Sequence, residues 1–545
     1  MKVRILLALI LFAGVLSLPF LLRKKDRSLK ELLVDPDTVV IISAHSEPMK
    51  YEFEQGFRKY YKKRFGKDIA IDWRSPGGTS DIVRYIADRY KASFRREWEA
   101  DPANPPWDSN IASAFDNPNI LKDPSADTAA KMARRKFLAS NVGIGVDLFA
   151  GGGTYDQSRH ARQGYAVEGG LFERHREYFD PEIFPESFGG DFLYDKQGRY
   201  YGVCLSSFGI CCNMDRLNEL SGNGEKILPR KWRDLGEGIY FNTVTVADPT
   251  KSGSANKCFE IILQQEMNLA VRNKKSAHIP PEDLDQGWAN GFNLIKRIIA
   301  NTRTITDSAG KVVRDIAAGE SAVGMAIDFY GLTEQEWNSF QMNGKPVIRY
   351  IAPLGGTSVS ADPIQLLRGA PHPEAAKAFL DYITGPEGQK LMNFKVGTPG
   401  GTEKYALRRS PVRKDLYKEQ YKKYRSDPGY NPYEAGKSFV YRGAWTGRYF
   451  SMIRILIRSL ALDVQDELRL AWKAILDAGG PEKVPLAYKE FCRLPFAYRD
   501  ARKVAGLLRV SRTRTKLEVA ALCRQWSDDA RKQYLKAAAL AEAGK

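Results

Sequence analysis

Signatures of common enzymes and metal sites are missing from this sequence. It contains no G-x-S-x-G nucleophile motif, no H-E-x-x-H metalloprotease motif and no complete G-x-x-x-x-G-K-S/T phosphate loop. The five histidines are scattered, and the six cysteines form no C-x-x-C or zinc-finger pattern, so we expect no structural metal. Asp147, Asp156 and Asp328 are the acidic residues that an enzyme would use, but strand-end aspartates also cap helices and bind cations. We therefore expect a protein that is not an enzyme and has no resident cofactor.

Basic charge is concentrated at one end of the chain. The formal net charge is +18, and residues 401–545 carry 31 Lys and Arg against 16 Asp and Glu. With 545 residues, 43% of them hydrophobic, the chain is long enough for two or three domains with sizeable cores. The basic, tyrosine-rich stretch 405–436 superficially resembles a nucleic-acid-binding pattern. The N-terminal segment described next predicts export, and an exported protein meets little nucleic acid, so we expect no nucleic-acid partner. We interpret the stretch as a solvated surface, with contact to anionic lipid or an acidic partner as the alternative.

Residues 1–30 have the features of a signal or anchor segment. A positively charged N-terminus precedes an apolar run over 5–22, and the basic run 23–25 follows without an A-x-A-like cleavage site. This pattern favours an uncleaved anchor over a cleaved signal peptide, and both export the rest of the chain. We expect a periplasmic protein tethered to the inner membrane through its N-terminus, or secreted after signal cleavage.

Strand and helix patterns alternate after this segment. The β-branched run "TVVIISAH" from Thr38 is typical of a strand buried on both faces, and "DIAIDWRSPGGTSDIVRYIADRY" continues with a strand, a glycine loop and a helix. Such alternation predicts a mostly parallel α/β sheet that binds ligands at the carboxyl ends of its strands. The polar, proline-rich residues 92–139 indicate an inserted surface segment.

Two stretches combine glycines with hydroxyl side chains. Ser252-Gly253-Ser254 follows an Asp-Pro turn and opens an apolar helix, and a triple glycine over 151–153 follows a short apolar strand. A helix start with exposed backbone N–H groups can hold an anion, and glycines let a ligand approach the backbone closely. A capped helix or a simple hinge is the alternative at each place.

Six stretches in a fixed order carry a family resemblance. They are "YGVCLSSFGICCNMDRL", "LPRKWRDL", "VADPTKSGSA", "GESAVGMAID", "APLGGTSVSADPI" and "HPEAAKAFLDYITGPEGQKLM". Over residues 38–400 the chain resembles the extracellular solute-binding proteins of ABC importers, within the cluster that binds ferric iron, thiamine, polyamines and phosphonates. This resemblance implies a type II periplasmic-binding-protein fold, which is α/β with two lobes and a hinge, followed by a mostly helical extension.

The resemblance also implies domain limits and ligand contacts. Lobe 1 is expected over 38–155 and 350–405, with the insertion at 92–139, lobe 2 over 156–349, and a basic helical extension over 406–545. Helix starts of both lobes are expected to point into the cleft. The implied contacts are Ser43, His45, Ser46, Gly78, Thr79, Ser80, Gly152, Gly153, Thr154, Tyr155, Ser252, Gly253, Ser254, Asp328 and Tyr330.

The nature of the solute stays open between two classes. Ferric-binding members resemble one another in a paired tyrosine, and here the corresponding place has Phe329 before Tyr330, with His45 at the position of their histidine. His45 and Tyr330 are metal ligands only if ferric iron is the cargo. A small anion or organic solute held by helix starts fits at least as well.

We therefore expect a monomeric receptor that captures a small-molecule or metal-ion solute by closure of its lobes and delivers it to an ABC permease in the inner membrane. A membrane-anchored sensory domain with the same cleft is the alternative, and an enzyme is the less favoured one.

Overall fold

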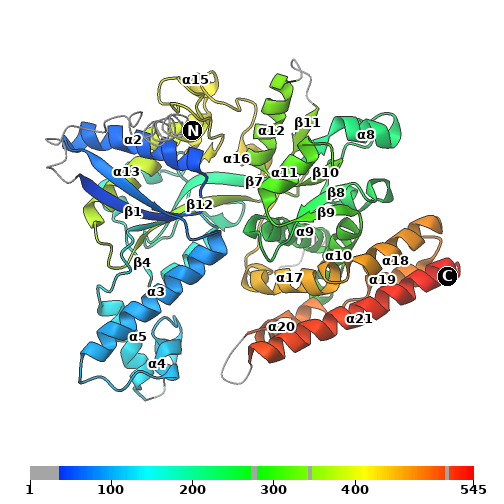
Figure 1. The fold of residues 1–545 in the computed structure, drawn as a ribbon, viewed down its shortest axis with the longest axis horizontal. Coiled ribbons are helices and arrows are strands. Elements are labelled where there is room, and N and C mark those ends of the chain that lie inside the picture. Colours follow the sequence, from blue (N-terminus) through cyan, green and yellow to red (C-terminus); the bar gives the residue numbers. More distant parts are fainter. Residues whose placement is uncertain (1–35, 125, 272–278, 342–346, 510–514) are drawn as a thin grey trace, which may run out of the picture.

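The computed structural model describes residues 36–124, 126–271, 279–341, 347–509 and 515–545. Two α/β halves lie side by side, and helices from the C-terminal end pack beneath the second half (Figure 1). The predicted α/β class and the helical C-terminal region are confirmed. Within the described residues, no helix is long and apolar enough to cross a membrane. The expected N-terminal anchor, residues 1–30, lies outside the described residues.

The first half is built on three parallel strands that each lead into a helix. The strands are β1 (Asp37–Ser43), β2 (Ile69–Arg74) and β3 (Leu148–Ala150), and the helices are α2 (Glu47–Phe65), α3 (Thr79–Ala100) and α6 (Thr154–Gln163). β1 lies between the other two and pairs with both. Along β1, Val39 and Ile41 pack into one buried cluster, while Val40 and Ile42 pack into another on the opposite face. This two-sided burial is what the continuous β-branched run predicts.

One long strand connects the two halves. β7 (Tyr201–Asn213) is buried along its whole length. Its first part pairs with β12 (Val359–Leu367) in the first half. Its second part pairs with β10 (Val323–Ile327) and β11 (Ile348–Ile351) in the second half. The two halves therefore share one continuous sheet, and β7 runs through the waist between them.

The crossing between the halves comes later in the chain than predicted. The expected boundary after Tyr155 would place the following residues in the second half. Instead, β4 (Ala166–Val167) pairs with β12, and Leu171 and Phe184 pack with the core around β1. The apolar side chains before β7 complete the first core, so the chain stays in the first half until it enters this strand.

The second half repeats the strand-to-helix pattern. Its parallel strands are β8 (Val244–Ala247), β9 (Thr302–Thr306) and β10. Its helices are α8 (Met214–Ser221), α9 (Gly253–Val271), α10 (Pro281–Ala300), α11 (Ala309–Ala317) and α12 (Asp328–Gln341). α9, α11 and α12 follow β8, β9 and β10 respectively, so their first turns lie at the carboxyl edge of the sheet.

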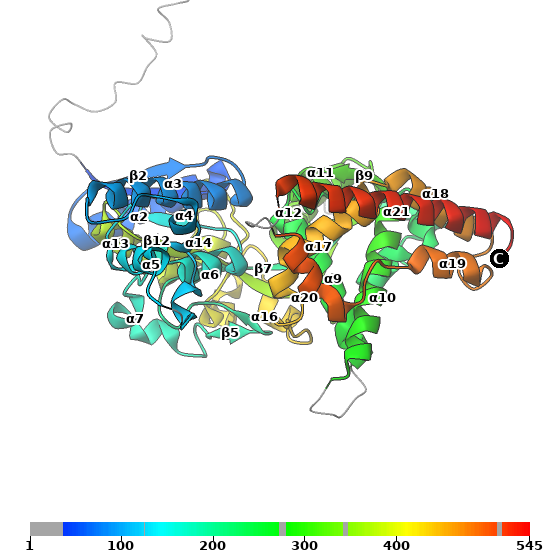
Figure 2. The same ribbon diagram turned by 90° about the horizontal axis from the view of Figure 1, so that it is seen from below.

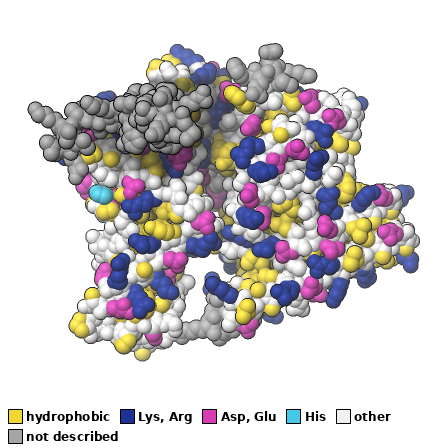
Figure 3. Space-filling model, viewed as in Figure 1, with side chains coloured by type: hydrophobic (Ala, Val, Ile, Leu, Met, Phe, Trp, Pro, Cys, Tyr) yellow, Lys and Arg dark blue, Asp and Glu magenta, His cyan; other side chains and the backbone are white. Residues whose placement is uncertain are grey.

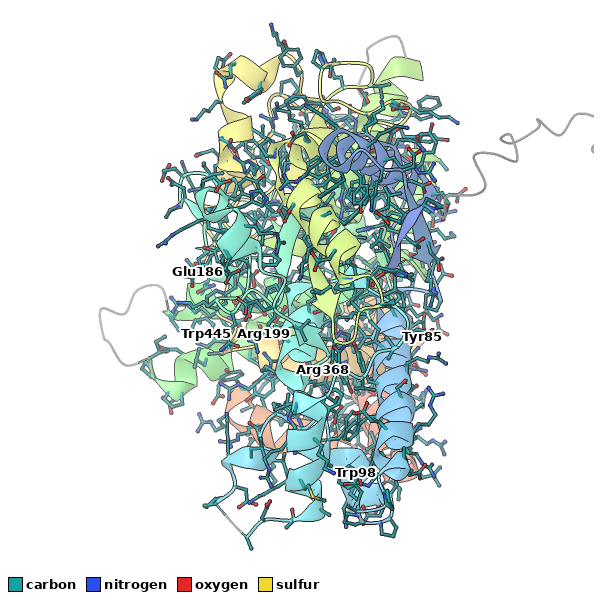
Figure 4. All side chains as sticks on the ribbon, turned by 90° about the vertical axis from the view of Figure 1, so that its left-hand side faces the viewer. Tyr85, Trp98, Glu186, Arg199, Arg368 and Trp445 are labelled. Atoms are coloured by element: carbon teal, nitrogen blue, oxygen red, sulfur yellow. The ribbon has the colours of Figure 1, made fainter. Side chains whose placement is uncertain are left out.

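The inserted segment forms helices with an aromatic core. α3 continues to Ala100, and α4 (Ser109–Ala114) and α5 (Ala129–Ala139) pack at its far end, where Trp98 is 1% exposed (Figure 4). Arg368, at the end of β12, donates to the carbonyl oxygens of Leu138 and Ser140 at 3.0 and 2.7 Å. These bonds hold the insertion against the sheet. The polar, proline-rich sequence of the insertion does not indicate this attachment.

The C-terminal region divides between the halves. Residues as far as Tyr433 belong to the first half, because β13 (Ser410–Pro411) pairs with β7, Tyr424 accepts a backbone hydrogen bond from Lys395, and Tyr433 packs in the core around β1. The helices after them share one hydrophobic core with α9 and α10 (Figure 2). A π-helical turn, η8 (Arg458–Leu462), separates the first two of these helices. These helices are α17 (Phe450–Ile457), α18 (Gln465–Asp477), α19 (Pro485–Cys492), α20 (Ala501–Leu507) and α21 (Lys516–Glu542).

The remaining helices and strands are short, apart from the pair that meets at Gly385-Pro386. That pair is α13 (Pro373–Thr384) and α14 (Pro386–Asn393), and the others are α7 (Leu171–Arg174), β5 (Ser187–Phe188), β6 (Asp191–Phe192), α15 (Glu419–Lys422) and α16 (Pro432–Ala435). All six cysteines lie in the described residues and are free thiols, four of them buried.

Candidate functional site

The loops that follow the parallel strands of the two halves face each other. The surface between the halves is hollowed, and Lys and Arg side chains lie along the edges of this hollow (Figure 3). Parallel strands present their carboxyl ends at one edge of a sheet, so loops from several strands meet there. We refer to the space between the two sets of loops as the cleft.

The loop after β1 lies at the first-half side of the cleft. Ser43, the last residue of β1, is fully buried, and its carbonyl oxygen accepts a hydrogen bond from the Ser75 hydroxyl at 2.8 Å. Ser75 in turn accepts from the Lys50 ammonium at 2.8 Å. The loops after β1 and β2 are therefore joined by hydrogen bonds and carry a cation near the cleft.

Two glycines after β3 make room for neighbouring side chains. Gly151 and Gly152 have φ values of 91° and 82°. A Cβ on Gly151 would lie 3.0 Å from Nε2 of His45, and one on Gly152 would lie 2.9 Å from the Thr79 methyl group. The left-handed backbone and the close contacts both require glycine. The structure thus brings together the predicted residues His45, Thr79 and Gly152.

His45 is the least satisfied polar group in this cluster. Both of its ring nitrogens are buried without a hydrogen-bond partner, although the residue as a whole is half-buried. Burial, with Arg409 and Lys50 nearby, lowers the pKa of His45 to about 3. The imidazole is therefore neutral at physiological pH and offers one N–H donor and one acceptor.

The loop before α3 serves its own helix. Gly78 is the residue before α3, and its backbone N–H donates to the Asp81 carboxylate at 3.1 Å. An acidic side chain already occupies this helix start, which disfavours a second anion there. Ser46 and Gly78 are exposed and Ser80 is half-buried, so of the predicted residues around β2, Thr79 is the one placed against the glycine loop.

The start of α9 has the expected cap. The Ser252 hydroxyl accepts the backbone N–H of Ala255 at 3.2 Å, while Gly253 is exposed and Ser254 is half-buried. The Asn256 side chain donates to the Phe450 carbonyl oxygen at 2.9 Å, which places α17 beside this helix start. Ser252 is thus used in capping α9, whose first turn lies at the carboxyl edge of the sheet because the helix follows β8.

Asp328 is the centre of a buried polar network at the start of α12. Its carboxylate accepts the backbone N–H groups of Ser207 and Phe329 at 2.9 and 2.8 Å and the Tyr430 hydroxyl at 3.2 Å. The Ser207 hydroxyl also contacts that of Tyr350 at 3.2 Å. Burial raises the pKa of Asp328 to about 6, and the hydrogen bond from Ser207 limits the rise. These bonds stabilise the waist and leave little of the carboxylate for a metal.

Arg409 lies at the meeting point of the two halves. It is 4% exposed, forms an ion pair with Asp362 on β12, and lies 3.8 Å from the centre of the Phe329 ring on α12. Its Nε is buried without a hydrogen-bond partner. Since Arg409 also acts on the pKa values of His45 and Asp328, it is close to the predicted groups of both halves. Sequence reasoning missed it because the expected resemblance ended near Gly400.

The possible iron ligands are not arranged as a metal site. Tyr330 is 40% exposed, packs against Phe329 with ring centres 4.2 Å apart and the rings tilted by 47°, and covers Gly310. Asp328 is committed to the hydrogen bonds above. Among the described residues, no group of three or more His, Cys, Asp or Glu side chains is placed to hold a metal ion.

Residues 156–425 match the family model of bacterial extracellular solute-binding proteins. This part of the chain is therefore a bacterial extracellular solute-binding domain, in agreement with the sequence resemblance, and the matched range includes Arg409. Proteins of this family are binding proteins rather than enzymes, and their extracellular character implies a periplasmic location.

Two relatives have similar sequences. An uncharacterized protein of Haemophilus influenzae is 26% identical over 279 residues, which are 50% of this chain and 66% of that protein. The phosphoglycerate transport regulatory protein PgtC of Salmonella typhimurium is 23% identical over 190 residues, 35% of this chain and 40% of that protein. This chain thus spans less than two thirds of the length of these relatives.

Solved structures of periplasmic proteins are also similar. The binding protein AfuA of Actinobacillus pleuropneumoniae, with fructose-6-phosphate bound, has 17% identity and a TM-score of 0.43 over 78% of this chain and 98% of its own. Iron-bound HitA of Pseudomonas aeruginosa has 13% identity and a TM-score of 0.45 over 77% of this chain and 98% of its own. At these TM-scores the likeness assigns no ligand to this chain.

Proposed function

We propose that this protein is a periplasmic receptor that encloses a small anionic solute, of the phosphorylated carboxylate class, between its two halves. One observation carries the proposal: a buried guanidinium with a free Nε and a buried imidazole with two free ring nitrogens lie where the halves meet. Unsatisfied buried polar groups are costly, so a site of this kind is completed by a ligand that supplies their partners. Arginine is well suited to phosphate and carboxylate oxygens.

Charge around the cleft supports an anion rather than ferric iron. Lys50 and Arg409 are near His45, and the one predicted carboxylate, Asp328, already accepts three hydrogen bonds from the chain. A trivalent cation would need several free oxygen ligands at this place. The name of the Salmonella relative, a phosphoglycerate transport regulatory protein, agrees with a phosphate-bearing acid.

Closure follows from the position of the site. Because His45 belongs to the first half and Phe329 to the second, a solute between them contacts both halves only when they are together. Such a solute binds the closed arrangement more tightly and shifts the population toward it. In this proposal the closed receptor, a monomer tethered by its N-terminal segment, delivers the solute to an ABC permease in the inner membrane.

A sensory role is the second candidate function. The Salmonella relative is named a regulatory protein of transport, and a receptor with the same cleft can report its solute to a membrane partner. The two functions share the site and differ in the partner of the closed form. Copurification of the loaded protein with a permease complex favours delivery, whereas copurification with a membrane-bound kinase favours sensing.

A ligand panel on the full-length protein tests the proposal. After unfolding and refolding to remove bound solute, thermal unfolding is followed with inorganic phosphate, 3-phosphoglycerate, 2-phosphonoacetate, thiamine, spermidine and ferric citrate. A ligand at about a hundred times its Kd adds roughly 2.7 kcal/mol to the free energy of unfolding. We expect phosphorylated or phosphonate acids to raise the melting temperature, and a response to spermidine or ferric citrate alone would contradict the proposal.

A pair of variants separates binding from folding. Arg409→Gln alone leaves the Asp362 carboxylate without its cation, and such a loss costs about 3–5 kcal/mol at a buried pair. The double variant Arg409→Gln with Asp362→Asn replaces the ion pair by two amides, and Asp362→Asn alone is its matched control. We expect the control to keep affinity for the responding acid better than the double variant, since the guanidinium remains only in the control.

A further inference from the structure

The C-terminal extension reaches the cleft opposite the helix that follows the triple glycine. The Phe450 ring on α17 lies against the Tyr155 ring on α6, with centres 5.4 Å apart. α17 is anchored to α9 through the bond from Asn256 to the Phe450 carbonyl oxygen. In both ribbon views α17 lies at the side of the second half that faces the first (Figures 1 and 2). The contact between Tyr155 and Phe450 therefore bridges the two halves.

Charged groups surround this ring contact. Burial raises the pKa of Asp156, and Arg159 and Arg454 act in the opposite direction. Burial lowers the pKa of Arg454, and Asp156 and Tyr155 oppose that change. Arg454 on α17 is thus within electrostatic reach of the first turn of α6, and its guanidinium carbon lies 5.3 Å from the centre of the Phe450 ring.

Several polar atoms in this region lack partners. They are Thr154 Oγ1 and Arg159 Nε from the first half and Arg454 Nε from the extension, and each is buried. Two guanidinium groups against one carboxylate leave a net positive charge, and each guanidinium keeps a free donor. The group that satisfies these atoms is therefore one with several acceptor oxygens and negative charge.

We propose that α17 forms one wall of the solute site and that Arg454 binds an acidic group of the solute, while Phe450 closes against Tyr155. This inference rests on the proposed function and deepens it. It assigns the acidic group of the solute that does not contact Arg409 and His45 to a residue outside the family match. The match ends at residue 425, and α17 begins at Phe450. The extension is then a determinant of specificity as well as a covering of the second half.

The test measures affinity for 3-phosphoglycerate and inorganic phosphate by calorimetry. Arg454→Gln is compared with Arg458→Gln, the matched control near the end of the same helix, whose exposed side chain pairs with Asp463 at 3.2 Å. Loss of a hydrogen bond to a charged group corresponds to a weakening of about tenfold to a hundredfold. We expect this loss for 3-phosphoglycerate in Arg454→Gln, a smaller loss for phosphate, and wild-type affinity for both in Arg458→Gln.

The outcomes separate the two ideas. If the wild-type protein binds the acid and Arg454→Gln binds it equally well, the wall is refuted and the proposed function stands. If the wild-type protein binds no phosphorylated acid, the proposed function and the proposed wall are both refuted.

A cross-link tests the geometry without a ligand. Tyr155→Cys with Phe450→Cys is expected to be joined by a bis-maleimide cross-linker that spans about 10 Å, because the two ring centres are 5.4 Å apart and the Cα atoms lie farther apart than a disulfide allows. The product is seen as a mobility change on a denaturing gel, and Tyr155→Cys with Arg458→Cys is expected to give much less of it. Failure of the first pair to cross-link in the presence and absence of the acid would also overturn the wall.

Discussion

Acid should destabilise this protein through His45, and the effect can be worked out from its surroundings. In the unfolded chain a histidine takes up a proton near pH 6.5, whereas burial, Arg409 and Lys50 lower the pKa of His45 in the folded state to about 3. Between these values the unfolded state binds more protons, so stability is present above pH 6.5 and is lost as the pH falls toward 3. Well below pH 6.5 each pH unit is worth about 1.36 kcal/mol, and because the unfolded histidine is already half protonated at pH 6.5, the loss between pH 6.5 and 5 is about 1.6 kcal/mol.

The assay is urea unfolding at a series of pH values, followed by tryptophan fluorescence. His45→Gln is expected to remove about this much of the pH dependence between 6.5 and 5, although loss of the edge contact with Phe53 lowers its stability at every pH. His160→Gln is the matched control: burial likewise lowers the pKa of His160 to about 3, but this ring is fully buried beside Gln365. Both variants should reduce the acid sensitivity.

The bound acid distinguishes the two histidines. An anion beside His45 favours the imidazolium and so raises the pKa of His45, which weakens the acid sensitivity of the loaded protein. This ligand effect should persist in His160→Gln and disappear in His45→Gln. A pH profile that is the same in His45→Gln and the wild-type protein would refute the reasoning from burial, and a ligand effect that survives in His45→Gln would remove the imidazole from the site.

Three further predictions concern helix capping, a glycine and a buried lysine. Ser252→Ala removes the cap of α9 and should lower the free energy of unfolding by about 1 kcal/mol, whereas Ser254→Ala should change it by less than about 0.5 kcal/mol. The double variant should bind the acid more weakly, and wild-type affinity in that variant would remove this loop from the site. Gly152→Ala, at a φ of 82° and with its Cβ 2.9 Å from the Thr79 methyl group, should cost about 1–3 kcal/mol in the same urea assay. Gly153→Ala, at a φ of −107° with no atom within 4 Å of its Cβ, should cost less than about 1 kcal/mol, which is the preference for glycine over alanine at the N-cap of α6; equal costs would contradict the conformational argument. Burial lowers the pKa of Lys296 to about 7 in the folded protein, while the same lysine keeps its proton above pH 7 in the unfolded chain, so the free energy of unfolding should rise with pH above 7. Lys296→Met should lack this rise in unfolding measurements between pH 7.5 and 9.5, and an unchanged rise would show that Lys296 is not its source.

Much of the local structure follows from patterns within short windows of sequence. The apolar run of β1 predicts a strand buried on both faces, and the Gly385-Pro386 pair marks the break between α13 and α14. The serine at position 252 predicts the cap that the structure shows. These features depend on neighbours along the chain, so periodicity and capping rules are enough to find them.

The candidate site depends on contacts that no short window contains. Arg409 follows the stretch that carries the family resemblance, yet it lies between His45 and Asp328, whose elements belong to different halves. The entry of α17 into the cleft likewise results from its packing on α9. By itself the sequence determined the strand-to-helix pattern, the cap of α9 and the resemblance to solute-binding proteins. Only the tertiary structure decided which charged groups are buried together without partners, because burial and electrostatic proximity depend on the path of β7 and the C-terminal helices through space.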